Sequence, residues 1–79
     1  MTTIKLKHPV KADGAEVAEV TMRAPKVRDM IAADKGGGSD AERELRMFAN
    51  LCEITPRIIE ELHLVDYKAM QGAYLDFLS

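Results

Sequence analysis

Disulfide pairs and clustered metal ligands are missing from this sequence of 79 residues. Cys52 is the single cysteine, so no disulfide can form within the chain. His8 and His63 are far apart, and neither has the neighbouring ligands that zinc sites require. A domain of this size buries only about 60–65% of the surface of its unfolded chain, and small domains without such links often gain stability from a partner. We therefore expect homo-oligomers or a client protein.

The residue groups that perform catalysis are also missing. There is no HExxH, no CxxC and no recognisable Ser/His/Asp set. The stretch GGGSDAERE at residues 36–44 lacks the Lys-Ser/Thr of a phosphate-binding loop, and Gly38 stands where an acyl carrier has Asp before its serine. Glu60 and Glu61 are adjacent and point apart, so they cannot act as an acid–base pair. We predict no catalytic residues, no metal and no cofactor.

Long apolar runs are absent too. The chain begins Met-Thr-Thr and lacks both the apolar stretch of a signal peptide and a segment that could span a membrane. Apolar residues form 47% of the sequence and charged residues 30%, as is typical of globular proteins. We expect a cytoplasmic protein that does not bind membranes.

The charges are unevenly distributed. Residues 1–28 contain six Lys/Arg and three acids, whereas residues 29–79 contain five Lys/Arg and ten acids. Ordinary solvated faces explain this difference, and we favour that explanation. The alternative is a contact between the basic part of one copy and the acidic part of another, because opposite charges steer association.

Residues 1–23 have the pattern of a β-hairpin. Apolar residues alternate with lysines over residues 4–7, which predicts a half-exposed strand. Asp13-Gly14 suits a tight turn, and the alternation resumes over residues 18–22. Val17 is out of phase with this second strand, which indicates a bulge or a loose start there. Pro9 lacks an N–H, which favours a strand end or an open edge.

The remaining residues, 25–79, have the apolar spacing of about four helices. The first is predicted at 25–34 with Pro25 in its first turn, the second at 40–53 capped by Ser39 or Asp40 with Glu42, the third from Pro56 after Thr55, and the fourth from Asp66 after a turn at Leu64-Val65. The predicted fold class is α+β, with the N-terminal hairpin packed on a small bundle of about four helices. We expect one domain, residues 1–79.

The second predicted helix has two apolar stripes on nearly opposite sides. One contains Leu45, Phe48, Ala49 and Cys52, and the other contains Met47, Leu51 and Ile54. A helix of this kind is either central, with both stripes covered, or leaves one stripe exposed for a partner. We favour the central placement, and the exposed stripe remains the alternative.

DNA binding is a minor alternative. The third and fourth predicted helices carry more acids than bases, so that region repels phosphates. The hairpin contributes the basic residues Lys5, Lys7, Lys11 and Arg23, which could contact DNA in a small regulatory protein. A mobility shift that weakens with salt would support this alternative.

The order of landmarks along the chain resembles that of the small phage tail assembly chaperones of tailed phages and prophages. The landmarks are VAEVTMRAP (17–25), VRDM (27–30), ELRMFANLCEIT (44–55), LHLVDYKAM (62–70) and YLDFL (74–78). They correspond to an Arg-x-Pro followed by Asp, an apolar helix that ends before Thr or Ser, and an Asp-Tyr that opens the last helix.

This resemblance implies a binding protein that holds the long, helical tape measure protein, keeps it soluble and helps to recruit tail tube subunits. Such proteins act in the bacterial cytoplasm during assembly and are absent from the finished tail, and many also have a longer form made by frameshifting. A structural tail component remains a further alternative.

Met adapts to irregular partners, so we assign a client or self-association surface to residues of the second and last predicted helices. These residues are Met47, Leu51, Ile54, Leu75 and Leu78. On this hypothesis, Met47→Asp and Leu51→Asp abolish partner binding while the monomer stays folded, and loss of the fold would show that the stripe is core.

Overall fold

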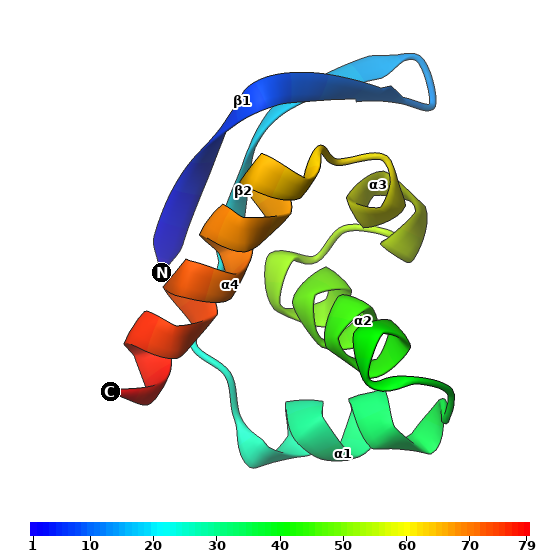
Figure 1. Cartoon of the computed structure of the whole chain (residues 1–79), viewed down its shortest axis with the longest axis vertical. Coiled ribbons are helices and arrows are strands. Elements are labelled where there is room, and N and C mark those ends of the chain that lie inside the picture. Colours follow the sequence, from blue (N-terminus) through cyan, green and yellow to red (C-terminus); the bar gives the residue numbers. More distant parts are fainter.

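The computed structural model describes residues 1–79 as a β-hairpin followed by four helices (Figure 1). The elements are β1 (Thr2–Ala12), β2 (Ala15–Met22), α1 (Val27–Lys35), α2 (Asp40–Cys52), α3 (Pro56–Glu60) and α4 (Leu64–Leu78). This order confirms the predicted α+β fold with an N-terminal hairpin. No helix combines the length and the apolar character needed to cross a membrane.

The two strands pair in an antiparallel register that is broken in the middle of β1. Lys5 pairs with Glu19 and Val10 with Val17, so residues 6–9 of β1 face only Ala18 of β2. The predicted irregularity therefore exists, but it lies in β1 and not at the start of β2. Pro9 lies within this segment and not at a strand end, and no ladder bond there needs its missing N–H. β1 is an edge strand of the two-stranded sheet, as the second alternative required.

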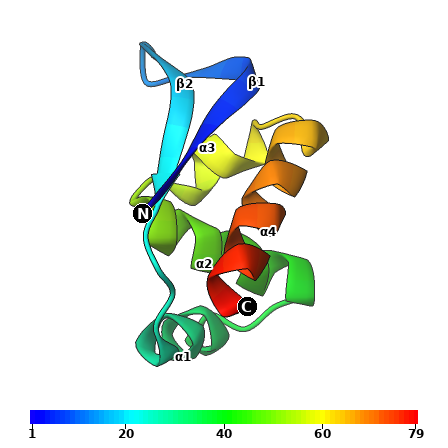
Figure 2. The same cartoon turned by 90° about the vertical axis from the view of Figure 1, so that its left-hand side faces the viewer.

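The core lies between one face of the hairpin and helices α2, α3 and α4. Ile4 and Leu6 of β1 are buried, as are Val20 and Met22 of β2, which confirms the predicted alternation at these positions, whereas Ala18 is exposed. Phe48 of α2 is fully buried, and its ring lies 5.5 Å from the rings of Tyr67 and Tyr74 in α4. Figure 2 shows α4 and α2 between the hairpin and α1, which lies at the opposite end of the molecule.

Helix α2 occupies the central position that we favoured. Phe48, Ala49, Leu51 and Cys52 are buried, and Met47 and Ile54 are half-buried against the same core. Both apolar stripes are therefore covered within one chain. The helix begins as predicted, because Ser39 accepts a hydrogen bond from the Glu42 amide and the Glu42 carboxylate accepts one from the Ser39 amide.

Two helix starts differ from the prediction. Helix α1 begins at Val27 after Lys26, so Pro25 lies in the connector and not in the first turn. Helix α4 begins at Leu64 after His63, so Leu64 is helical and not part of a turn. Asp66 is consequently the third residue of α4 and not its N-cap. Its side chain accepts hydrogen bonds from amides of β1 and does not cap its own helix.

Candidate partner-binding surface

Helix α1 is held at its N-terminal end by an ion pair between the half-buried Arg23 and the buried Asp29. The Arg23 guanidinium donates two hydrogen bonds to the Asp29 carboxylate, at 2.9 and 2.8 Å, and the Lys26 amide donates a third at 2.8 Å. Asp29 is only 2% exposed. This bidentate contact fixes direction as well as distance, which gives the Arg and the Asp of the sequence landmarks a structural role.

The Asp29 contact predicts a specific acid sensitivity. Hydrogen bonding from Arg23 holds the pKa of Asp29 at about 2, below its ordinary value of 3.8. A lowered pKa in the folded state means that the ionised carboxylate stabilises the fold above the ordinary value, and that this stability is lost as the pH falls through about 2. Asp29→Asn should therefore lower the urea midpoint clearly at pH 7 and progressively less toward pH 3. Asp13→Asn, in the exposed turn, is the matched control. An equal loss at both pH values would contradict the assignment.

The C-terminal end of α1 is held by hydrogen bonds from Arg46 of α2. Its guanidinium donates hydrogen bonds to the Ala33 carbonyl at 3.2 and 2.9 Å, and another to the Gly37 carbonyl. These carbonyls lack helical partners, and a cation suits the C-terminal end of a helix. Polar contacts thus hold both ends of α1, and Ala33 is its one buried apolar residue.

Held in this way, α1 exposes its large apolar side chains. Val27 is 69% exposed, Met30 56% and Ile31 49%. Their spacing of three and four residues places them on one side of the helix. We call these three residues the α1 stripe.

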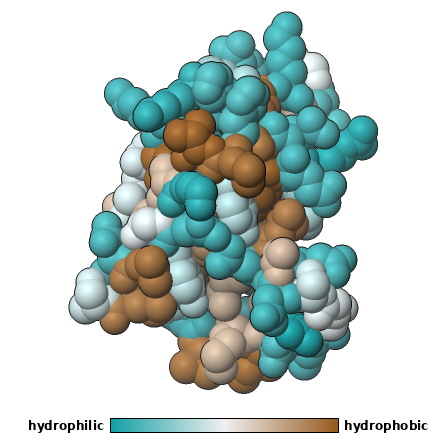
Figure 3. Space-filling model, in the orientation of Figure 1, coloured by the Kyte–Doolittle hydropathy of each residue, from teal (hydrophilic) through white to brown (hydrophobic).

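A second exposed apolar group lies at the C-terminal end of α4. Leu75 is 63% exposed and Leu78 59%. Figure 3 shows hydrophobic surface over this end of α4, at the lower left, and over α1 at the bottom. Contiguous exposed apolar surface marks interaction sites more often than single exposed residues do.

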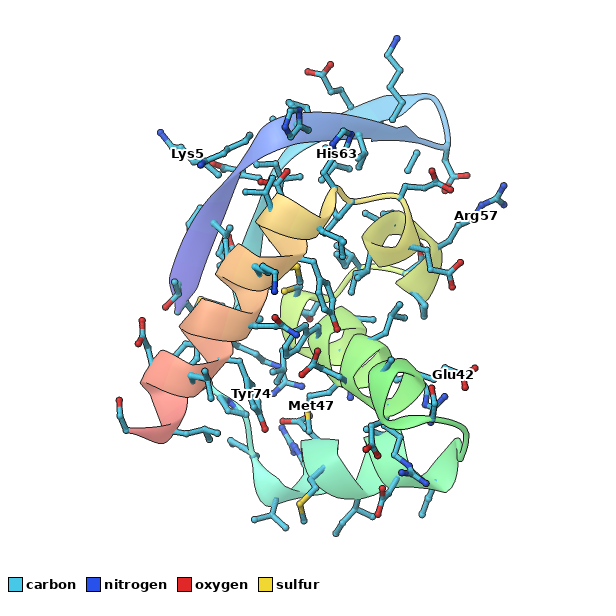
Figure 4. All side chains as sticks on the ribbon, viewed as in Figure 1. Lys5, Glu42, Met47, Arg57, His63 and Tyr74 are labelled. Atoms are coloured by element: carbon cyan, nitrogen blue, oxygen red, sulfur yellow. The ribbon has the colours of Figure 1, made fainter.

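A groove of about 180 Å³ lies among α1, α2 and α4. Figure 4 shows Met47 of α2 and Tyr74 of α4 pointing into the space between these helices. The groove is lined by Met30, Ala33, Asp34, Arg43, Glu44, Met47, Phe48 and Tyr74. A larger hollow of about 690 Å³ lies against the other flank of α1 and includes Ala32 and Ile54.

The structure does not bring the five predicted surface residues together. Leu51 is 1% exposed and belongs to the core, which corrects its assignment to a surface. Met47 lines the groove, whereas Ile54 lines the hollow on the other flank of α1. Leu75 and Leu78 are exposed.

The α1 stripe was missed as a surface. Its spacing was visible in the sequence, but spacing does not say whether a stripe faces the core or solvent. In the folded chain the side of α1 that carries Asp29 and Ala33 faces inward, where Asp29 binds Arg23, so the stripe faces solvent. No local sequence pattern predicts that contact.

The hairpin offers little cationic surface for DNA. In the strand register Lys5 lies opposite Glu19 and Lys11 opposite Glu16, so acidic residues alternate with the lysines along the hairpin. Arg23 is bound to Asp29. Phosphate binding requires several clustered cations, so this geometry speaks against the DNA-binding alternative.

His8 and His63 stack although they are distant in sequence, with ring centroids 4.1 Å apart. No group of three or more His, Cys, Asp or Glu side chains is placed to hold a metal ion.

Cys52 is buried, which raises the pKa of its thiol to about 11 and disfavours the reactive thiolate.

Comparison with protein families agrees with these landmarks. The family model described as "Phage tail assembly chaperone proteins, E, or 41 or 14" matches residues 3–79, nearly the whole length. Neither a curated protein nor a solved structure matches the chain with significance.

Proposed function

Because the chain belongs to the family of phage tail assembly chaperones, we propose that it binds the tape measure protein through the exposed apolar surface of α1 and the end of α4. The observation that carries this proposal is the α1 stripe, which a helix of only nine residues exposes while polar contacts hold its ends. Exposed apolar residues of this kind can cover the apolar face of a client helix. The resemblance in sequence favours a long helical client.

The same proposal includes assembly of the tail tube. A chaperone bound along the tape measure protein keeps it soluble and helps to recruit tube subunits, and it leaves before the tail is finished. This role needs reversible binding and no catalysis. It also accommodates homo-oligomers, because a surface that binds apolar helices can bind a second copy.

Co-expression with the tape measure protein of the same phage or prophage tests the proposal. We expect the soluble fraction of the tape measure protein to rise several-fold and both chains to co-purify, because the chaperone covers apolar surface that would otherwise aggregate. The variant that tests the surface is the triple change Val27→Ser, Met30→Ser and Ile31→Ser. It removes exposed apolar groups, leaves the core intact and should solubilise the tape measure protein less well. A tape measure protein that stays insoluble, or that is solubilised equally by the triple variant, would contradict the proposal.

A further inference from the structure

The groove among α1, α2 and α4 is too small for a metabolite. Its volume is about 180 Å³, whereas small-molecule sites measure roughly 300–1,000 Å³. Its floor contains Phe48 and Met47, and Tyr74 forms part of its wall. A hollow of this size and character suits a large apolar side chain of another protein.

The charges beside the groove are mostly negative. Arg43 is the one cation among the lining residues, and it already contacts Asp34 at 3.4 Å and Asp40 at 3.1 Å. Glu44 accepts hydrogen bonds from Tyr67 at 2.7 Å and Gln71 at 2.8 Å. Two carboxylates, Asp34 and Glu44, therefore line the groove with one engaged cation, and Asp40 lies beside that cation. A partner with Lys or Arg beside its apolar side chain complements them.

The groove is continuous with exposed apolar surface on two sides. Met30 belongs both to the lining and to the α1 stripe. Tyr74 lines the groove, and Leu78 lies one helical turn further along the same side of α4. An elongated partner can thus fill the groove and contact both helices, as an amphipathic helix does.

We propose that this groove anchors one amphipathic helix of the tape measure protein, inserting a large apolar side chain that has Lys or Arg within one turn. This inference rests on the proposed function and adds the place of binding and the kind of segment bound. Methionines at the anchor allow successive segments with different side chains to bind, because Met adapts its shape.

Overlapping labelled peptides of about 25 residues, long enough to form helices, covering the tape measure protein provide the test. We expect a subset to bind in fluorescence anisotropy, each combining an apolar helical stripe with Lys or Arg. Met30→Gln, which removes an exposed apolar lining side chain without adding charge, should weaken their binding about tenfold or more. Ala32→Gln, on the other flank of the same helix, should change it by less than about twofold.

Salt and peptide charge provide a second readout. Binding should weaken as NaCl is raised, and replacing the flanking Lys or Arg of the best peptide with Glu should weaken it further, because complementary charges contribute. If peptide binding is the same at high NaCl and after the Lys or Arg is replaced with Glu, the charge requirement is wrong.

Other outcomes would overturn the placement of the helix. A larger effect of Ala32→Gln would place the client in the hollow on the other flank. Loss of self-association in Met30→Gln, with unchanged peptide binding, would show that a second copy occupies the groove. If the full-length tape measure protein is still solubilised by Met30→Gln, the chaperone function stands and only this site fails.

Discussion

Leu51→Asp is expected to unfold the protein, although the two-stripe hypothesis predicted a folded monomer that has lost its partner. Leu51 is 1% exposed within the core cluster, and the Arg23 amide donates a hydrogen bond to its carbonyl. An aspartate there would lose a large apolar contact and bury a carboxylate without a partner. We expect a loss of about 5 kcal/mol or more, which equals much of the stability of a small domain.

Circular dichroism and urea denaturation measure this effect. Leu51→Met keeps the volume and should cost less than about 1.5 kcal/mol, and Leu51→Ala should cost about 3 kcal/mol. Leu75→Asp, at a site that is 63% exposed, should leave the fold intact. A folded Leu51→Asp protein that no longer binds its partner would instead restore Leu51 to a binding surface.

Asp66→Ala is expected to weaken the attachment of the hairpin to α4. The Asp66 carboxylate accepts hydrogen bonds from the amides of Lys7 at 2.8 Å and His8 at 3.1 Å. Both amides lie in the segment of β1 that β2 does not pair, so removal of the carboxylate leaves part-buried donors without a partner. We expect the thermal midpoint to fall by roughly 10 °C.

The matched variants of this prediction separate charge from hydrogen bonding. Asp66→Asn keeps one acceptor and should lose less stability than Asp66→Ala, and Asp76→Ala, at an exposed site on the same helix, should change little. Burial acts to raise the pKa of Asp66, but the two backbone hydrogen bonds prevail and lower it. The stabilisation is therefore present above the ordinary value and is lost in acid. Equal midpoints for Asp66→Ala and Asp76→Ala would show that the contact does not hold the hairpin.

Features set by neighbouring residues could be predicted from the sequence. The Asp13-Gly14 turn has φ angles of 52° and 80°, as the residue types indicate. Ser39 and Glu42 form their capping box within one helical turn. The buried alternation of β1 and the α+β order depend on periodicity that each element carries by itself. The order of landmarks also identified the family.

The candidate site was only partly predictable. Leu75 and Leu78 are exposed as a surface requires, whereas Leu51 is buried and the α1 stripe was overlooked. An apolar stripe indicates that a helix has an apolar side, but the same stripe can be buried in the core or bind a partner.

The sequence by itself determined which helices and strands form, where most of them begin, and to which family the chain belongs. These features depend on short-range chemistry and on the order of motifs. Tertiary structure alone decided that Asp66 binds β1 amides that are 58 and 59 residues away, and that Arg46 binds the Ala33 carbonyl at the end of α1. Such contacts join side chains to backbone groups that any residue possesses. They leave no periodic mark in the sequence, and only the folded chain shows which surface remains uncovered.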